Sequence, residues 1–336
     1  MIDLHLHLDG SLSIEDFKFL AKKQGFDLGD SFPQNIYVNE DCRSLEEYLE
    51  RFNLPLCLLQ DAFSIAYVTR SLIIRLNKMG YIYAEIRFAP QLHTQKGLSQ
   101  EDAVLAAIEG LEQGLKDCPT FKANLILCCM RQSEYDVNLP AILLADKYRD
   151  RHVVSVDLAG PEAFHTGDYY IPLFNEAKKR EINVIIHAGE ACGSSEVMIA
   201  INDLHAQRIG HGVHLEINDG NLKIIKSKKI AFEFCPTSNL QTTSLPNYEA
   251  VPLKEFMDNG ICVTINSDNM TVSNTDVNQE FRHLKHAFNL SEKDIKKLLK
   301  NSIKASFTTK EEKQALRKEL ESRFSSFYLG LLEIAS

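Results

Sequence analysis

Three polar side chains that can bind a metal ion lie close together at the start of the chain. The segment LHLHLD (4–9) alternates leucines with His5, His7 and Asp9. Residues two apart on a strand point the same way, so both imidazoles can meet one ion. A structural zinc site would use closely spaced cysteines, which are missing, whereas imidazole and carboxylate ligands with an open position suit a catalytic zinc. The segment therefore predicts a catalytic metal site, with Asp9 as a third possible ligand.

Polar motifs also end later strand-like segments. HAGE (187–190), GHG (210–212) and SDN (267–269) each follow an apolar run. In a parallel barrel the chemistry sits at the carboxyl ends of the strands. A lone histidine at such a place is more often a satisfied loop residue, but that does not explain a set of histidines and carboxylates at several strand ends. His187 and Asp268 are natural further ligands, because each ends a different strand of the same sheet.

Short apolar, β-rich runs alternate with longer helical patterns along the chain. The expected strands cover residues 2–8, 83–89, 123–129, 153–159, 182–188, 208–211, 230–235 and 261–267. The expected helices between them cover residues 13–24, 61–79, 100–116, 138–149 and 171–180. Ser13, with Asp16 three residues later, is a capping-box-like start for the first helix.

Eight strands that alternate with helices predict an α/β fold closed as a (β/α)8 TIM barrel. The alternative is an open doubly wound sheet, but no glycine-rich dinucleotide or phosphate-loop motif follows any strand. The first two strands are too far apart for one helix, so residues 25–60 are expected to cover one end of the barrel. The C-terminal part is expected to add further helices, with 310–324 presenting a solvated face. No linker or repeat divides the chain, which predicts a single domain over residues 1–336.

The composition is that of a soluble globular protein, with 44% hydrophobic and 25% charged residues. The net charge is −9 without a basic run, so nucleic-acid binding is not expected, because phosphate contacts need clustered Lys and Arg. No apolar stretch is long enough to span a bilayer, and no secretion signal opens the chain. The eight cysteines are scattered without a C-x-x-C pair, which indicates a reduced chain. We therefore expect a cytoplasmic protein without a membrane or nucleic-acid partner.

Seven segments together resemble the adenosine deaminase family, within the metal-dependent amidohydrolase superfamily. They span nearly the whole chain in the family's order. The segments are IDLHLHLDGSL (2–12), YAEIRFAPQLH (83–93), VDLAGPE (156–162), HAGE (187–190), RIGHGVHL (208–215), FEFCPTSNLQT (232–242) and INSDN (265–269). The resemblance implies a zinc-dependent hydrolase that deaminates a purine nucleoside, adenosine and also 2′-deoxyadenosine, to inosine-type products and ammonia.

The resemblance implies one zinc ion, with a bound water and four protein ligands: His5, His7, His187 and Asp268. It also implies that Asp268 is a catalytic residue. Zinc lowers the pKa of a bound water to about 7 and so supplies a strong nucleophile at neutral pH. Two-metal members of the superfamily often bridge their ions with a carboxylated lysine that ends the fourth strand. That strand here ends in VDLAG (156–160), without a lysine, so a single metal is the better interpretation.

The resemblance also implies that Glu190 protonates purine N1 and that His211 orients the attacking water and stabilises the charge on it. Gly160 would offer its backbone N–H to N3, and Asp9 would hold the ribose 5′-hydroxyl, with His7 as a further substrate contact. To act as an acid near pH 7, Glu190 must have a raised pKa, as expected in a closed apolar pocket. An acidic residue at this position could simply stabilise the N-terminus of the helix that follows. The HAGE motif at the end of this strand favours the catalytic role for Glu190.

The end of the eighth strand departs from the family pattern. Many members have Asp-Asp there, with the second residue contacting purine N7, whereas this chain has Asp268 followed by Asn269. N7 is an acceptor, and a carboxylate can donate to it only when protonated, while an amide has two permanent donors. Asn269 is therefore expected to serve N7 at least as well.

LEEYLERF (45–52) places four apolar or aromatic side chains on one helix face. They are Leu45, Tyr48, Leu49 and Phe52. Ordinary core packing would explain such a face. The resemblance makes it a lid that covers the nucleoside and excludes water.

Three other functions stay open on the sequence. An adenine deaminase of the same superfamily would act on the free base, although Asp9 argues for a sugar pocket. Another mononuclear metal hydrolase, for phosphoesters or amides, is disfavoured by Glu190 and by the missing lysine. A non-catalytic binding protein is disfavoured by the complete set of ligands and acid. The remaining histidines His93, His165 and His205 are expected in mobile loops or at the surface, without a role.

Overall fold

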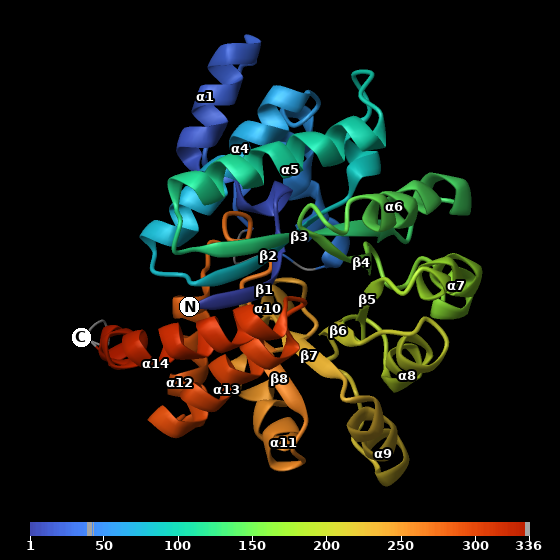
Figure 1. Cartoon of the computed structure of the whole chain (residues 1–336), viewed down its shortest axis with the longest axis vertical. Helices are drawn as coiled ribbons and strands as arrows, with labels where there is room; N and C mark the ends of the chain where they lie inside the picture. The colour runs from blue at the N-terminus through green and yellow to red at the C-terminus, as the bar shows by residue number, and fades with distance from the viewer. Residues whose placement is uncertain (39–41, 43, 333–336) are drawn as a thin grey trace.

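A computed structural model describes residues 1–38, 42 and 44–332. Its eight strands form one parallel sheet in sequence order, at the centre of the molecule with helices outside them (Figure 1). The strands are β1 (Ile2–His7), β2 (Tyr83–Phe88), β3 (Lys122–Met130), β4 (Val153–Ala159), β5 (Asn183–Ala188), β6 (Arg208–His211), β7 (Ala231–Phe234) and β8 (Cys262–Ile265). All eight expected strands are confirmed.

The barrel closes between β8 and β1 through one residue. The backbone N–H of Asp268 donates to the carbonyl oxygen of His5, and the N–H of His7 donates to the carbonyl oxygen of Asp268, each over 2.8 Å. These bonds form a parallel bridge between Leu6 and Asp268. The closed (β/α)8 barrel is therefore confirmed, and the open doubly wound sheet is excluded.

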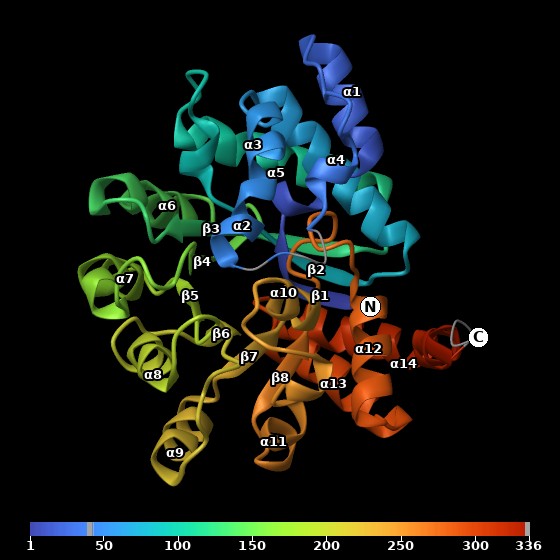
Figure 2. The ribbon, with the colours of Figure 1, turned by 180° about the vertical axis from the view of Figure 1, so that it is seen from behind.

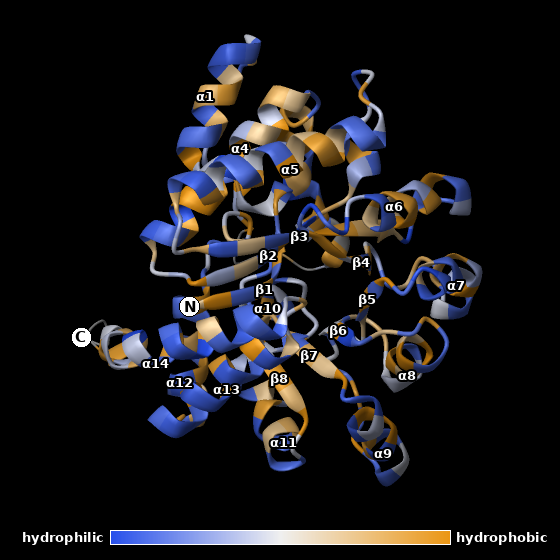
Figure 3. Cartoon of the chain, in the orientation of Figure 1, coloured by the Kyte–Doolittle hydropathy of each residue, from blue (hydrophilic) through white to orange (hydrophobic). Residues whose placement is uncertain are grey.

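The helices expected between the strands are also confirmed. In α1 (Ile14–Gln24) the predicted capping box is complete: the Ser13 hydroxyl accepts from the N–H of Asp16, whose carboxylate accepts from the N–H of Ser13. The other helices that alternate with strands are α4 (Ala62–Lys78), α5 (Gln100–Asp117), α6 (Tyr135–Lys147), α7 (Ile171–Lys179), α8 (Ser194–Asn202), α9 (Asp219–Lys228), α10 (Pro236–Gln241) and α11 (Leu253–Asp258). Figure 3 shows apolar and polar strips on these helices, as expected where one face packs on a barrel.

The insertion after β1 lies over one end of the barrel, as expected. It contains α2 (Leu45–Leu49), a short 3-10 helix (Glu50–Phe52) and α3 (Asn53–Leu58). Seen from behind, α2 and α10 lie in front of the strands (Figure 2). Positions 39–41 and 43 of the predicted insertion lie outside the described residues.

Three helices follow β8 within the described residues, namely α12 (Val277–Phe288), α13 (Glu292–Ala305) and α14 (Lys310–Leu332). The predicted solvated helix face over 310–324 is present on α14, but the sequence did not predict that the other side of this helix is buried. Leu316, Leu320 and Phe324 are buried, and their spacing of four places them on one face. The many charged residues between them hide this apolar stripe in the sequence.

No single helix in the described part of the chain is long and apolar enough to cross a membrane. One consecutive pair, Glu47–Leu58 and Ala62–Lys78, reaches that length and composition only when taken together, and it is bent by 118°.

Candidate active site

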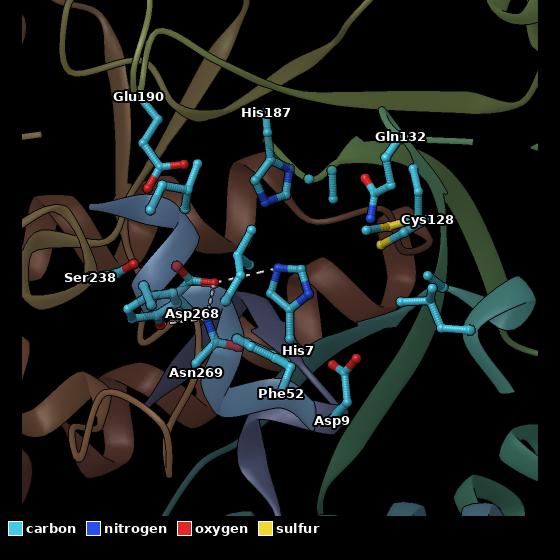
Figure 4. Close-up of a pocket in the computed structure, with 18 of the residues that line it drawn as sticks. His7, Asp9, Phe52, Cys128, Gln132, His187, Glu190, Ser238, Asp268 and Asn269 are labelled. Atoms are coloured by element: carbon cyan, nitrogen blue, oxygen red, sulfur yellow. Dashed lines mark hydrogen bonds and ion pairs between the residues drawn. The ribbon is translucent and has the colours of Figure 1, made fainter. Parts of the chain in front are cut away.

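The predicted metal ligands converge at the carboxyl end of the barrel. His5 and His7 extend from β1 and His187 from β5, and their ligand nitrogens lie within 4.8 Å of one another. Asp268 follows β8, and its Oδ1 lies 3.5 Å from Nε2 of His5 and 3.4 Å from Nε2 of His7. Figure 4 shows His7, His187 and Asp268 pointing toward a common point. The four side chains offer nitrogen and oxygen donors of the kind that zinc binds.

Two buried carboxylates orient these imidazoles. Glu233 Oε2 lies 2.8 Å from Nδ1 of His5, and Asp157 Oδ1 lies 3.1 Å from Nδ1 of His187. Each Nδ1 therefore donates its hydrogen to a carboxylate, which leaves Nε2 free to bind a metal. His5 Nε2 is buried and has no hydrogen-bond partner among the described residues. An orphaned buried nitrogen calls for an explanation, and a bound cation supplies one.

Two buried arginines hold those carboxylates in turn. Arg87 donates to Asp157 over 2.7 Å and to Glu233 over 2.8 Å. Arg208 pairs with Glu233 over 2.5 Å and with Glu85 over 2.6 Å. Burial alone would raise the pKa of Glu233, but Arg208 and Arg87 hold that pKa well below its usual range. The carboxylate that orients His5 is therefore ionised at neutral pH and is a strong acceptor.

Glu190 and His211 lie together beside the predicted metal ligands. Glu190 is buried in the loop after β5, with 7% of its surface exposed. His211 ends β6, and its Nε2 lies 3.6 Å from Glu190 Oε2. Burial raises the pKa of Glu190 against the opposing effect of His211, and the negative charge of Asp268 raises it further. Burial and Asp268 thus shift Glu190 toward the protonated carboxyl, which is the form that a proton donor needs.

Asn239 fixes the tautomer of His211. Its Nδ2 lies 3.1 Å from His211 Nδ1, and an amide nitrogen only donates, so the ring proton lies on Nε2, toward Glu190. His211 (φ 62°) and Asp268 (φ 59°) both adopt a left-handed backbone. This conformation is costly for residues other than glycine and clusters at active sites. The contact of Asn239 with His211 joins residues that lie 28 positions apart, so it could not be read from the sequence.

Glu162 holds the loop that carries Glu190. Its buried carboxylate accepts four backbone N–H bonds over 2.6–3.0 Å, from Gly189, Glu190, Ala191 and Cys192. A carboxylate that accepts several N–H groups is a strong anchor. Glu162 belongs to the VDLAGPE segment, but no role was expected for it. Glu162 follows β4, the strand next to β5, and this position is the one sequence feature that indicates a contact with the loop after β5.

A cavity of about 200 Å³ opens beside the predicted metal ligands. It has room for a small molecule rather than a polymer. The four predicted lid residues line it, together with the predicted substrate contacts His7, Asp9, Gly160 and Asn269. Leu56 and Leu92 extend the apolar wall. The structure therefore brings every predicted substrate-binding residue to one cavity.

Asn269 uses both of its amide hydrogens within the protein. Nδ2 donates to the Tyr48 hydroxyl and to Asp268 Oδ1, each over 2.8 Å. The Tyr48 hydroxyl also lies 2.7 Å from the Ser273 hydroxyl, so α2 is connected twice to the loop after β8. The two donors expected for purine N7 are both engaged, and a contact with N7 requires Asn269 to release one of these bonds.

Two further residues differ from expectation. His93, expected in a mobile loop or at the surface, is fully buried, with Nδ1 2.8 Å from the carbonyl oxygen of Leu59. Burial lowers the pKa of His93 to about 4, so it is a neutral structural residue at pH 7. Cys235, for which no role was expected, belongs with His5 and Asp268 to a second group whose ligand atoms lie within 4.8 Å of one another.

A family model and a sequence relative assign the chain to the same family. The family model described as adenosine deaminase matches residues 1–323. An adenosine deaminase of Haemophilus ducreyi is 44% identical over 332 residues, which cover 96% of each chain.

Solved structures show the same fold with different named substrates. An adenine deaminase from Arthrobacter aurescens superposes with a TM-score of 0.86 at 24% identity, covering 96% of this chain and 98% of that one. An Arabidopsis N6-mAMP deaminase superposes with a TM-score of 0.84 at 25% identity, covering 96% of this chain and 97% of that one. The fold therefore does not select among base, nucleoside and nucleotide, and the lining of the cavity must do so.

Proposed function

The chain belongs to the adenosine deaminase family and is an enzyme of that family, and we propose that it hydrolyses adenosine and 2′-deoxyadenosine. Water adds at purine C6 and N6 leaves as ammonia, which gives inosine or its deoxy form. The observation that carries this proposal is the position of Glu190, buried and with a raised pKa, beside His211 and the predicted metal ligands. Hydrolytic deamination needs that combination of an acid and an activated water.

One zinc ion is the cofactor we propose, with His5, His7, His187 and Asp268 as the residues that would hold it. The orphaned Nε2 of buried His5 supports this set. When bound, zinc lowers the pKa of water to about 7 and thereby supplies a nucleophile at neutral pH. The fourth strand ends without a lysine, which favours a single ion over a bridged pair.

The charges buried around these histidines also fit a divalent cation. The connected network contains two guanidinium groups and four carboxylates, namely Arg87, Arg208, Glu85, Asp157, Glu233 and Asp268. Negative groups therefore exceed positive groups by two. An uncompensated buried charge is costly, and a divalent cation among the histidines would balance this excess.

Glu190 and His211 would perform the proton chemistry. Protonation of N1 by Glu190 makes C6 electrophilic, and the raised pKa of Glu190 keeps the required proton available. His211 carries its ring proton on Nε2, so it would donate to the attacking oxygen and stabilise the negative charge there.

The cavity lining supports contacts with both base and sugar. Gly160 has a φ of 96°, and its N–H donates to no other group in the part of the chain that is described, so it is available to N3. Asp9 Oδ1 is buried without a hydrogen-bond partner among the described residues, and burial raises the pKa of Asp9 to about 6. A ribose 5′-hydroxyl would satisfy this oxygen. Asn269 would donate to N7 in exchange for its bond with Tyr48.

The lid would be formed by Leu45, Tyr48, Leu49 and Phe52, all of which line the cavity. Their apolar surface excludes water from the reacting groups, which strengthens the electrostatic interactions inside. The bonds from Tyr48 to Asn269 and Ser273 hold this lid against the barrel.

We also propose that residues 1–336 act as one cytoplasmic domain in purine salvage, without nucleic-acid or membrane partners. No disulfide joins cysteines in the part of the chain that the structure describes, which fits a reducing compartment.

A substrate panel with metal analysis tests the proposed function. The purified chain should contain one zinc per molecule and should turn over adenosine and 2′-deoxyadenosine but not adenine. Turnover of adenine alone would instead make it a free-base deaminase. The His187→Ala variant should lose zinc and activity, whereas His214→Ala should keep both. His214 is a matched control because it lies in a loop with its Nε2 3.0 Å from the carbonyl oxygen of Ser244.

A further inference from the structure

The side chain of Gln132, two residues after β3, points into the cavity without a partner. It lines the cavity, and Figure 4 shows its amide above Cys128, on the side opposite Glu190 and Ser238. Its amide makes no hydrogen bond within residues 1–38, 42 and 44–332. The amide is therefore free to bind a substrate group, and it is exposed enough to do so without rearrangement of the core.

The amide of Gln132 lies directly over Gly160. A Cβ atom added to Gly160 would come within 2.5 Å of Gln132 Oε1, so the glycine makes room for this amide. Since the N–H of Gly160 is proposed to bind purine N3, Gln132 lies where the substrate atoms next to N3 would be. This step rests on the proposed function.

The chemistry next to N3 identifies the group that Gln132 would meet. N3 lies beside the glycosidic bond, and in the anti conformer it is on the C2′ side of the sugar. An amide both donates and accepts hydrogen bonds, as a hydroxyl does. The side of the cavity that holds Gln132 also holds Asp9, the proposed partner of the 5′-hydroxyl (Figure 4). The 2′-hydroxyl and the 5′-hydroxyl of the sugar would then both find a partner, Gln132 and Asp9, on the same side of the cavity.

We propose that Gln132 binds the 2′-hydroxyl of the substrate and makes the enzyme favour ribonucleosides over 2′-deoxyribonucleosides. The cavity lining described here contains no Lys or Arg, so its sugar side fits a neutral nucleoside rather than a nucleotide. A hydrogen bond of ordinary strength gives a preference of about tenfold in kcat/KM.

Variants of Gln132 test this assignment with three substrates. Gln132→Met keeps the length of the side chain and removes its amide, and Gln132→Ala removes both. Each variant should lower kcat/KM for adenosine and for 3′-deoxyadenosine about tenfold, and should leave 2′-deoxyadenosine within about twofold. The matched control is Gln113→Ala on α5, where the amide is exposed and donates to Glu109. The control variant should leave kcat/KM unchanged for all three substrates.

The outcomes separate the two proposals. An equal loss for adenosine and 2′-deoxyadenosine, or no loss for either, overturns the assignment of Gln132 while the proposed function stands. A loss that spares 3′-deoxyadenosine instead of 2′-deoxyadenosine moves the contact to the 3′-hydroxyl and also overturns it. An unmodified, zinc-loaded chain that turns over neither nucleoside overturns the proposed function, and the Gln132 assignment with it.

Discussion

Asp268 and His5 meet twice: a hydrogen bond joins their backbones, and their side chains lie close together. The N–H of Asp268 donates to the carbonyl oxygen of His5 over 2.8 Å, while Asp268 Oδ1 lies 3.5 Å from His5 Nε2. The seam that closes the barrel is thus also the place where the proposed metal ligands from β1 and from the loop after β8 meet. Because the backbone bonds do not use the side chains, we expect a substitution of a proposed ligand to leave the barrel closed.

Asn269, next to this seam, should affect the substrate and not the metal. Asn269→Ala removes a hydrogen-bond donor from the cavity, so kcat/KM for adenosine should fall about tenfold. Zinc content should stay normal, because all four proposed ligands remain. Steady-state kinetics and metal analysis of the same preparation check both statements. Asn259→Ala, which changes an exposed amide that donates to Glu255, is the control. Zinc loss in Asn269→Ala would place Asn269 among the ligands.

Glu190→Gln should keep zinc and lose most deamination. The substitution preserves the size of the side chain but removes the proton that Glu190 is proposed to give to N1. General acid catalysis typically contributes a factor of about 100 to 10,000, so kcat should fall by at least a hundredfold. Metal analysis and an ammonia-release assay are the measurements. Near-normal turnover in this variant would refute the assigned role.

The same carboxyl should set the alkaline limit of the reaction. Burial raises the pKa of Glu190 above its ordinary value, and the active form is the protonated one. Activity should therefore be present below this raised pKa and be lost as pH rises through it. The pH profile of kcat/KM reports groups of the free enzyme. A profile that falls only on the acid side would contradict this assignment.

Much of this site could be predicted because its residues end strands. The alternation in β1 separates His5 and His7 from the leucines between them, and a strand period of two is visible in a single sequence. His187 and Asp268 follow apolar runs, and the topology of a parallel barrel brings such ends together. These are local patterns combined with one rule of the fold.

The supporting residues could not be predicted, for a physical reason. Glu233 and Arg87 lie inside β7 and β2, where a charge has no local explanation. His5 lies 228 positions from Glu233 along the chain, although their side chains are 2.8 Å apart. The buried face of α14 was missed for a different reason. Charged residues surround Leu316 and Leu320 and obscure the apolar stripe. In both cases a tertiary contact decides what the residue does.

Glu162 should prove to be a positioning residue for Glu190. Glu162→Gln replaces one carboxylate oxygen by an NH2 group, which faces backbone N–H donors and repels them. The loop should shift, so kcat should fall roughly 10- to 100-fold while KM for adenosine changes little, because the proposed purine and sugar contacts stay in place. Glu196→Gln is the matched control, since buried Glu196 accepts one N–H bond, from Gly167 over 2.7 Å, and holds a different loop. Equal effects of the two substitutions would reduce Glu162 to a general structural role.

Glu280, which does not line the cavity, should make folding stability depend on pH. It is buried on α12, where it accepts hydrogen bonds from Thr237 and Thr275. Burial raises its pKa from 4.5 to about 7, and nearby Asp276 adds to the increase. The folded state therefore binds more protons than the unfolded state between these two values. Its contribution to the free energy of unfolding is fully present below the unfolded pKa and is lost as pH rises through the folded pKa.

The size of this effect follows from the shift. One pKa unit corresponds to about 1.4 kcal/mol, so Glu280 should account for a loss of roughly 3 kcal/mol across this range. Glu280→Gln keeps the size of the side chain and does not titrate, so its unfolding free energy should lack this part of the slope. Urea unfolding of both zinc-saturated chains, from about pH 5 to about pH 8, measures the difference. Glu311→Gln, in the exposed first turn of α14, should leave the slope unchanged. Parallel curves for Glu280→Gln and the unmodified chain would show that Glu280 takes up no proton on folding.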